Sequence, residues 1–400
     1  MHLYFFLFLI LQNIGTIYYR GIETGKAKSI QFERILIDTN FSQGYQIKSA
    51  DLNGDGFTDL VAVSTRMPEI YWYQNPSWEK HLLYDKTRNN IDIAPIDVDG
   101  DGDIDLALAS RFNLGNSTQG GYIHWLENTR GAVFWKEHFI DSIPTSHRLR
   151  WADIDGDEKD ELINLPIIGR GAERPDYDQG VEFTYYKIPE TPTVSPWSKH
   201  IIDTSLHMAH GIQLVQGEGS RWTLLTASFE GVSLFTPPET GVGNDWTRTH
   251  LGAGHKGMRP GQGSSEVGLG QLPANEKFIA TIEPWHGNEV VTYRPGGAGR
   301  LWKRQVIDTS FNDGHALICS DLDSDGVDEI IAGHRGKDYH LYYYQFDQRD
   351  LQWIRHNIDQ GGMSTAGLCI LDFNQDGRMD IAAAGSATNN IVLYENLDKK

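Results

Sequence analysis

The sequence predicts an all-β fold, a seven-bladed β-propeller of four-stranded blades in which an N-terminal strand closes the last blade. Three observations predict it. An acidic motif recurs along the chain, a second motif that begins with an aromatic residue recurs at a similar period, and the segments between them alternate as short strands do. The 42 glycines and the 11% content of aromatic residues suit a chain of many strands and tight turns.

The acidic motif reads D-x-[DN]-x-D-G-x-x-[DE] followed by a hydrophobic residue, except that Glu158 replaces glycine in its third copy. The five copies start at Asp51, Asp97, Asp153, Asp321 and Asp372. These starts differ by 46, 56, 168 and 51 residues. Because 168 is three times 56, we expect two further repeats without the motif between the third and fourth copies.

The aromatic motif marks one strand in every repeat and is often followed by His and Ile-Asp. Its seven copies begin at Phe32, Trp78, Trp135, Trp197, Trp246, Trp302 and Trp353. Each repeat then holds four strands, and seven such units are typical of a propeller. The chain opens with a strand of this last type, Phe32–Asp38, and ends after a strand of the third type, Ile391–Asn396. We therefore expect the first strand to complete the last blade, which leaves no sheet edge bare.

The acidic motif also carries most of the charge imbalance. The chain has 54 acidic and 35 basic residues, a formal net charge of −19, and the five motif segments hold 22 of the acids. Outside these segments the chain is close to neutral. Nucleic acid is not an expected partner, because a phosphate-binding surface needs a basic stripe.

Carboxylates at positions 1, 3, 5 and 9 of one short loop repel one another, and a hard divalent cation with six to eight oxygen ligands offsets that repulsion. We therefore expect structural Ca²⁺ in these loops. An EF-hand is excluded, because position 12 is never the Glu that it needs and the flanks alternate as strands do. The predicted ligands are Asp51, Asn53, Asp55, Asp59, Asp97, Asp99, Asp101, Asp105, Asp153, Asp155, Asp157, Glu161, Asp321, Asp323, Asp325, Glu329, Asp372, Asn374, Asp376 and Asp380.

The repeats resemble FG-GAP or VCBS-type repeats, the calcium-bearing blades also found in integrin α-subunit propellers, over residues 32–396. One stretch, IEPWHGNEVVTYR at 282–294, is similar to the propeller domain of aldos-2-ulose dehydratase/isomerase. The resemblance implies a calcium-bearing propeller with a link to carbohydrate. Those enzymes carry cupin domains after the propeller and this chain stops at Lys400, so an isomerase activity that depends on cupins is not implied.

The N-terminal residues 1–27 are interpreted as an export signal, and residues 28–400 as the propeller. The apolar run at 3–11 is too short to span a bilayer, so we expect no stable membrane span. Calcium loops suit a compartment rich in free Ca²⁺. The expected location is therefore extracytoplasmic, either secreted or periplasmic.

A candidate site is expected at the rim opposite the acidic loops, here called the upper rim. Six residues before position 1 of the acidic motif stand His147 and His315, and His210 takes the same place if Gln216 is a degenerate position 1. Tyr45 is the equivalent residue of the first repeat. Equivalent residues of a propeller point toward one central opening. Neutral imidazoles there are suited to proton abstraction or to binding Zn²⁺.

Two sets of residues are therefore candidates. The candidate catalytic residues are His210, His315, His147, Arg259 and Arg148. The candidate substrate-binding residues, all from the upper loops, are Trp285, His286, Asn288, Glu283, His255, His207, His334, Arg335 and Tyr45.

Three functions remain open at this point. The first is a carbohydrate lyase or dehydratase, in which His210 or His315 abstracts a proton, arginines hold the enolate oxygen and Trp285 stacks on the sugar ring. The second is a non-catalytic module that binds a glycan or a protein. The third is a structural scaffold. A small sugar or a glycan is the expected ligand.

Overall fold

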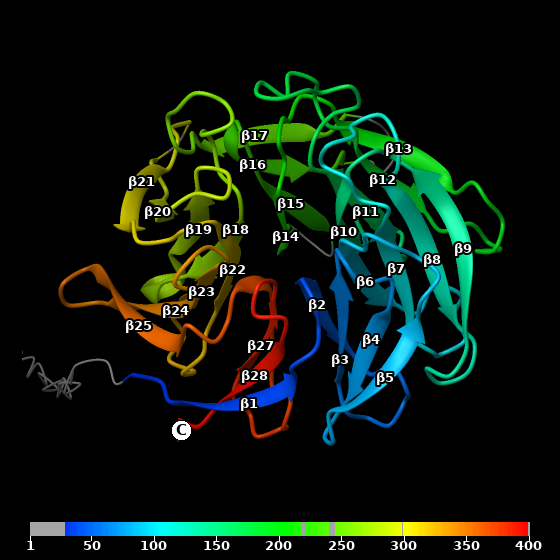
Figure 1. Cartoon of the computed structure of the whole chain (residues 1–400). Coiled ribbons are helices and arrows are strands. Elements are labelled where there is room, and N and C mark those ends of the chain that lie inside the picture. The colour runs from blue at the N-terminus through cyan, green and yellow to red at the C-terminus, as the bar shows by residue number, and fades with distance from the viewer. Residues whose placement is uncertain (1–28, 218–220, 240–244, 298, 399–400) are drawn as a thin grey trace, which may run out of the picture.

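The computed structural model describes residues 29–217, 221–239, 245–297 and 299–398. Within these residues the strands form seven four-stranded antiparallel sheets, arranged as blades around a central axis (Figure 1). The predicted fold class is confirmed. The predicted export segment, residues 1–27, lies outside the described residues.

The blades are numbered in chain order, and each runs from an inner to an outer strand. The strands of blades 1 to 3 are β2 (Gly44–Ala50), β3 (Asp59–Ser64), β4 (Ile70–Gln74), β5 (Glu79–Tyr84), β6 (Asp92–Ile96), β7 (Asp105–Ser110), β8 (Tyr122–Asn128), β9 (Trp135–Ser142), β10 (Ser146–Ala152), β11 (Glu161–Pro166), β12 (Phe183–Lys187) and β13 (Ser198–Asp203). Those of blades 4 and 5 are β14 (Gly211–Gln216), β15 (Trp222–Ser228), β16 (Gly231–Thr236), β17 (Thr247–Gly252), β18 (Val267–Gln271), β19 (Lys277–Glu283), β20 (Glu289–Arg294) and β21 (Lys303–Asp308). Those of blades 6 and 7 are β22 (Gly314–Ser320), β23 (Glu329–His334), β24 (His340–Asp347), β25 (Gln352–Gln360), β26 (Thr365–Leu371), β27 (Asp380–Gly385), β28 (Ile391–Asn396) and β1 (Phe32–Asp38).

The ring closes as the sequence predicts. Strand β1 pairs antiparallel with β28 and forms the outer strand of blade 7, with Phe32 opposite Asn396 and Leu36 opposite Val392. The two ends of the described chain therefore meet in one sheet, and the outer edge of β28 is covered (Figure 1).

The burial of each strand follows its place in the blade. The second strands, such as β3 (DLVAVS) and β27 (DIAAAG), are buried along their whole length, because neighbouring blades pack on both of their faces. The fourth strands are largely exposed. Their recurring histidines stack on the third strand, as His138 does on Trp125 with ring centroids 4.4 Å apart, which makes them packing residues of the outer blade.

The two rims of the ring have separate roles. Every acidic motif joins the first strand of a blade to its second, so all five lie on the lower rim. The loops that lead into each first strand, and those between the second and third strands, lie on the upper rim. A search of the described residues for a helix long and apolar enough to cross a bilayer finds none.

Candidate functional site: a histidine cluster at the propeller axis

Three equivalent histidines meet at the axis. His147 lies near the start of β10, His315 near the start of β22, and His210 directly before β14. The ring centroids of His147 and His210 are 4.6 Å apart, and those of His210 and His315 are 5.1 Å apart. All three side chains are fully buried. The structure therefore brings together the three histidines that the repeat spacing singled out.

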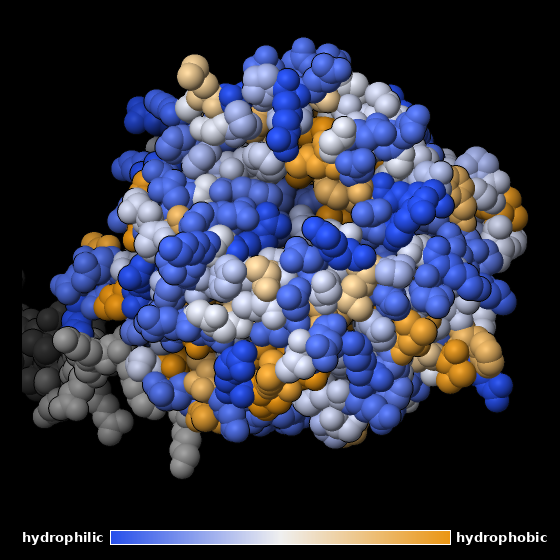
Figure 2. Space-filling model, viewed as in Figure 1, coloured by the Kyte–Doolittle hydropathy of each residue, from blue (hydrophilic) through white to orange (hydrophobic). Residues whose placement is uncertain are grey.

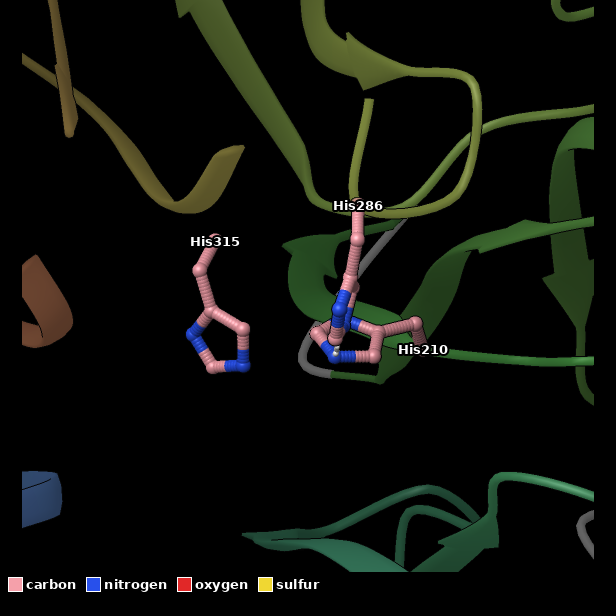
Figure 3. Close-up of side chains that lie close together, drawn as sticks. All are labelled: His210, His286 and His315. Carbon is pink, nitrogen blue, oxygen red and sulfur yellow. Dashed lines mark hydrogen bonds between the residues drawn. The ribbon is translucent and has the colours of Figure 1, made fainter. Parts of the chain in front are cut away.

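A fourth imidazole comes from blade 5, which lies between the blade of His210 and the blade of His315. His286 lies in the loop between β19 and β20 with a left-handed φ of 49°, and its Nε2 lies 3.1 Å from the Nε2 of His210 (Figure 3). Its ring centroid is 5.0 Å from that of His315. Blade 5 thus reaches the axis through a loop residue rather than through its inner strand. The sequence marked His286 as a substrate-binding candidate and did not predict its place in the cluster.

The second nitrogen of three of these rings faces an acceptor. The Nδ1 of His210 lies 2.8 Å from Oε1 of Glu266, that of His286 lies 3.1 Å from Oδ1 of Asp313, and that of His315 lies 2.7 Å from the carbonyl oxygen of Ala366. Of these three contacts the one of His315 has hydrogen-bond geometry, so its Nδ1–H donates to the carbonyl, whereas the other two are close contacts of an imidazole with a carboxylate. Sequence reasoning missed Glu266 and Asp313. The one sequence feature that could have indicated them is their closeness in the chain to the repeat positions. Glu266 follows the position equivalent to His210, and Asp313 precedes His315 by two residues.

Tyr45 connects the remaining histidine to this set. Its hydroxyl lies 2.9 Å from Nε2 of His147 and 3.1 Å from Nε2 of His315. Because the Nδ1–H of His315 donates to a carbonyl, its Nε2 accepts the proton of Tyr45, and Nε2–H of His147 donates to the Tyr45 oxygen. The Nδ1 of His147 is then an unprotonated, buried atom with no hydrogen-bond partner among the described residues.

The electrostatics keep these imidazoles neutral. Burial lowers the pKa of His210 to about 3, and burial and the nearby arginines hold the pKa values of His147 and His315 well below their usual range. Burial alone would raise the pKa of Glu266, but Arg148 and His210 outweigh it and hold that pKa at about 2. The cluster therefore presents neutral imidazoles beside an ionised carboxylate.

The donor set at the axis suits a transition metal. One ligand atom from each of His210, His286 and His315 lies within 4.8 Å of the others. The Nε2 atoms of His210 and His286 face each other at 3.1 Å, and a proton or a cation held between these two nitrogens satisfies both of them. Imidazoles held in this way by carboxylates and carbonyls are a common environment of protein-bound Zn²⁺.

The three predicted arginines make different contacts. Arg148 is 2% exposed, and its guanidinium lies 2.9 Å from Glu266, so it is fixed by an ion pair at the axis. Arg335 lies 3.1 Å from both Asp313 and the Nδ1 of His286. Arg259 donates to the backbone oxygen of Asp176 in an upper loop. Of these three, Arg335 is the one in direct contact with the histidine cluster.

Four predicted substrate-binding residues lie outside the cluster. Glu283 is fully buried, and its carboxylate accepts from Ser264, Thr281, Tyr293 and Arg304, so its interpretation as a substrate contact is wrong. His255 is paired with Glu289 at 3.2 Å, and the ring of His334 packs against Phe311 and His340. Asn288 is exposed and donates to the backbone of Thr309.

His207 and Trp285 do border the site. His207 is paired with Glu230 at 2.8 Å, next to Phe229. Trp285 packs with Phe229 and Met208 in a small apolar cluster of the upper loops, and its ring centroid is 4.4 Å from that of His286. The space-filling view shows a hollow near the centre of this face, with hydrophobic residues along one margin (Figure 2).

A cavity of about 510 Å³ lies on the upper rim of blade 2, within the range of roughly 300–1,000 Å³ that is typical of small-molecule sites. Arg88, Arg111 and Phe112 help to line it. Phe112 also contacts the cluster, with its ring centroid 5.7 Å from that of His147. His286 is the most exposed of the clustered histidines, with 21% of its side chain accessible, so a ligand from the upper rim reaches the cluster on its side.

The acidic loops have a common internal structure. In blade 2 the carboxylate at position 9, Asp105, accepts from the backbone N–H groups of Val98 and Asn128 at 3.0 and 2.7 Å. Burial raises its pKa to about 7, and it raises that of Glu329 in blade 6 to about 9. These buried carboxyl groups ionise less readily than usual because other carboxylates surround them. A bound cation would stabilise their ionised form.

Blade 3 differs from the other acidic loops. The ammonium of Lys187 contacts Asp155 and lies 3.5 Å from Asp157 and 3.8 Å from Glu161. The side chain therefore supplies the positive charge that a metal would supply elsewhere. The carboxylates of Asp153, Asp155 and Glu161 also converge to within 4.8 Å, so the predicted calcium site of this loop stays a prediction, and a cation bound there would compete with the ammonium.

Comparisons with known families match both resemblances seen in the sequence. The family described as aldos-2-ulose dehydratase, beta-propeller domain, matches residues 120–295, which include His147, His210, Glu266 and His286. The FG-GAP-like repeat family matches residues 51–108 and 321–383, which include four of the five acidic loops. The two matches together cover the lower-rim loops and most of the histidine cluster.

One curated relative is aldos-2-ulose dehydratase of Phanerodontia chrysosporium. It is 27% identical to this chain over a match that covers 55% of this chain and 26% of the relative. The chain therefore spans about a quarter of the length of that relative.

Solved structures share the fold. Two crystal structures of BBS1N in complex with ARL6DN, soaked with lead and with mercury, have TM-scores of 0.53 and 0.54 at 13% and 11% identity. They cover 93% and 90% of this chain, and the matches cover 98% and 95% of theirs. At this identity the likeness concerns the propeller fold alone.

Proposed function

We propose that this propeller acts on a keto-sugar as a carbon–oxygen lyase, a dehydratase that removes water by proton abstraction and β-elimination. The observation that carries the proposal is the axial cluster of four imidazoles, kept neutral by burial and oriented by acceptors on three of them. The relative named as a dehydratase, and the match of its propeller family over most of the cluster, support this choice of reaction.

In this proposal the facing Nε2 atoms of His210 and His286 would hold a Zn²⁺ ion, because both nitrogens of His315 are already hydrogen-bonded to Ala366 and Tyr45. When bound, such an ion supplies a Lewis acid for the carbonyl oxygen of the substrate. Glu266 and Asp313 would orient these two rings, since each carboxylate lies beside an Nδ1.

His147 is the proposed base. Its Nδ1 has no hydrogen-bond partner and no carboxylate contact among the described residues, whereas the Nδ1 of His210 lies 2.8 Å from the Glu266 carboxylate and that of His315 donates to the carbonyl oxygen of Ala366. It takes the proton from the carbon next to the carbonyl, the C–H electron pair forms the new double bond, and the hydroxyl on the following carbon leaves. The imidazolium returns the proton to that hydroxyl, which departs as water. Tyr45 holds the ring in this tautomer through Nε2.

The sequence-based roles of the arginines change accordingly. Arg148 neutralises Glu266 and positions His210 through it, so it is a positioning residue. Arg335, beside His286 and 18% exposed, is placed to hold a developing negative charge on the substrate. Trp285 would border the sugar on the exposed side of His286.

Structural Ca²⁺ in the acidic loops of blades 1, 2, 6 and 7 completes the proposal, together with an extracytoplasmic location. The carboxylates at positions 1, 3 and 5 of blades 2 and 6 converge to within 4.8 Å, which suits an oxygen-ligated cation. These ions would stabilise the lower rim and take no part in the reaction.

The test is turnover of a panel of keto-sugars, followed as new conjugated-enone absorbance, with the metal content of the same protein measured by elemental analysis. The H147Q variant should lose turnover by about 10²-fold or more while it keeps its zinc. The H286A variant should lose both zinc and turnover. The matched control is H200Q. His200 stacks on Tyr185 in an outer strand, so its replacement should leave both turnover and zinc content unchanged.

A non-catalytic glycan- or protein-binding module is the second candidate. The FG-GAP-like match and the full burial of His147, His210 and His315 favour it. Saturable binding of a glycan that is never converted, with affinity unchanged in H147Q, would contradict the lyase and establish this alternative.

A further inference from the structure

The inner strands line a second cavity, which borders the histidine cluster through His315. This cavity of about 80 Å³ is lined by residues of β2, β10, β22 and β26, among them Lys48, Arg148 and Arg150, and by Glu266. It is too small for a sugar but has room for a small ion with a few water molecules. The cavity lies on the propeller axis, because all four strands are the innermost of their blades.

The charges around this cavity do not balance. The seven inner strands carry three cationic side chains, Lys48, Arg148 and Arg150, and one carboxylate, Asp92. Arg150 is paired with Asp92 at 3.1 Å, and Arg148 is paired with Glu266 at 2.9 Å. This leaves one net positive charge, and it resides on Lys48.

Two donors there have no partner. Lys48 makes no hydrogen bond or ion pair with any residue that the structure describes, although it lines the cavity. Arg148 is 2% exposed, and its Nη1 is buried and likewise unpartnered within the described chain. Lys48 is partly buried and the Arg148 Nη1 fully so, and cationic donors withdrawn from bulk water are normally paired, because leaving them without an acceptor costs free energy.

We propose that this axial cavity binds one small monovalent anion of halide size, held between Lys48 and the free Nη1 of Arg148. One such anion cancels the single excess charge and accepts hydrogen bonds from both donors. A divalent anion would overcompensate, and a neutral ligand would leave the charge of Lys48 unmatched. The ion would link blades 1 and 3 across the axis, directly below the proposed substrate site.

Electrostatics support the need for an acceptor. Burial and the neighbouring Arg150 lower the pKa of Lys48 to about 8, while Asp92 and Cys369 act in the opposite direction. Its ammonium is thus still the main form at neutral pH, where an anion would be required.

Crystals of the full chain soaked in sodium bromide test the site directly. We expect an anomalous bromide peak within hydrogen-bonding distance of Nζ of Lys48 and Nη1 of Arg148. A cavity that holds only water in bromide-soaked crystals would overturn the proposal. This measurement needs no variant and is therefore independent of whether a substitution folds.

Solution measurements extend the test. The melting temperature at constant ionic strength should rise with chloride concentration, when chloride replaces gluconate, and should saturate. In K48M the chloride concentration for half of the effect should be about tenfold higher or more. The matched control is K303M, which removes the same charge from an exposed site and should respond like the wild type. An equal chloride response in K48M and the wild type would contradict the assignment.

Discussion

At the scale of single residues, the cluster depends on groups that neutralise one another. Glu266 is the clearest case, because one of its oxygens lies 2.8 Å from His210 and 2.9 Å from Arg148. The carboxylate therefore contacts a histidine of the cluster and balances a buried guanidinium at once. Its removal should affect stability as well as the site.

Replacing Glu266 with Gln should lower the free energy of unfolding by about 3–5 kcal/mol, because it leaves the buried Arg148 charge uncompensated. Chemical denaturation measures the loss. The double variant R148M/E266Q should recover much of it, since neither charge then remains. E182Q is the control, because the pair of Glu182 with Lys199 is partly exposed and should contribute at most about 1 kcal/mol. A loss in E266Q no larger than in E182Q would contradict the coupling.

Lys48 gives a pH dependence with a defined sign. Its pKa is about 8 in the folded protein and 10.5 in the reference state, so the unfolded chain binds more protons between these values. In buffer free of halide, stability should therefore rise with pH across this window, by at most about 1.4 kcal/mol per pH unit. The difference between the wild type and K48M isolates this contribution from other titrating groups. A parallel pH profile in the two proteins would show that Lys48 is not perturbed.

At the scale of elements, each acidic loop is a self-contained turn. Asp51 accepts from the backbone N–H groups of Gly54, Asp55 and Gly56, and the position-9 carboxylate Asp59 accepts from Leu52 and Asn75. The loop geometry is therefore encoded by local residues. The need of a loop for a metal depends on whether a neighbouring strand supplies a positive charge, as Lys187 does in blade 3.

Chelation should lower the melting temperature, and added Ca²⁺ should restore it. Each site that binds only in the folded state contributes about 2.7 kcal/mol at a hundredfold excess of Ca²⁺ over its Kd. The variant D99N in blade 2 should reduce the drop caused by chelator. D155N, at the same loop position in blade 3, should leave it unchanged, because Lys187 already supplies the charge there. Equal effects of the two variants would contradict this distinction.

At the scale of the whole molecule, stability depends on closing the ring. Strand β1 pairs with β28 over its length, and directly before it the backbone N–H of Ile30 donates to the Tyr343 hydroxyl in blade 6 at 2.7 Å. The first described residues thus hold blades 6 and 7 together. The closure also keeps the histidines of separate blades at their observed spacing.

A chain that lacks residues 1–38 should expose the edge of β28. We expect it to lose stability and to self-associate, because a bare strand edge pairs with other chains. Light scattering coupled to size-exclusion chromatography measures the association. A chain that lacks only residues 1–28 keeps β1 and is the control. A stable monomer after removal of residues 1–38 would show that the closing strand is dispensable.

The fold was largely predictable because short repeated sequence motifs encode it. The Trp and acidic motifs recur within each blade, so the number of blades, the four strands of each and the closing strand Phe32–Asp38 all followed from spacing. The convergence of His147, His210 and His315 followed as well, because repeat positions become neighbours around a propeller axis. These features need only the sequence and the symmetry of the ring.

The tertiary structure alone decided which charges meet. His286 reaches the axis through a loop that obeys no repeat, Glu266 and Asp313 become partners of histidines in other blades or loops, and Glu283 is turned inward to bind its own blade. Lys187 enters an acidic loop from a strand 30 residues away. Such contacts depend on distances between side chains that are remote in sequence, and no local pattern encodes those distances.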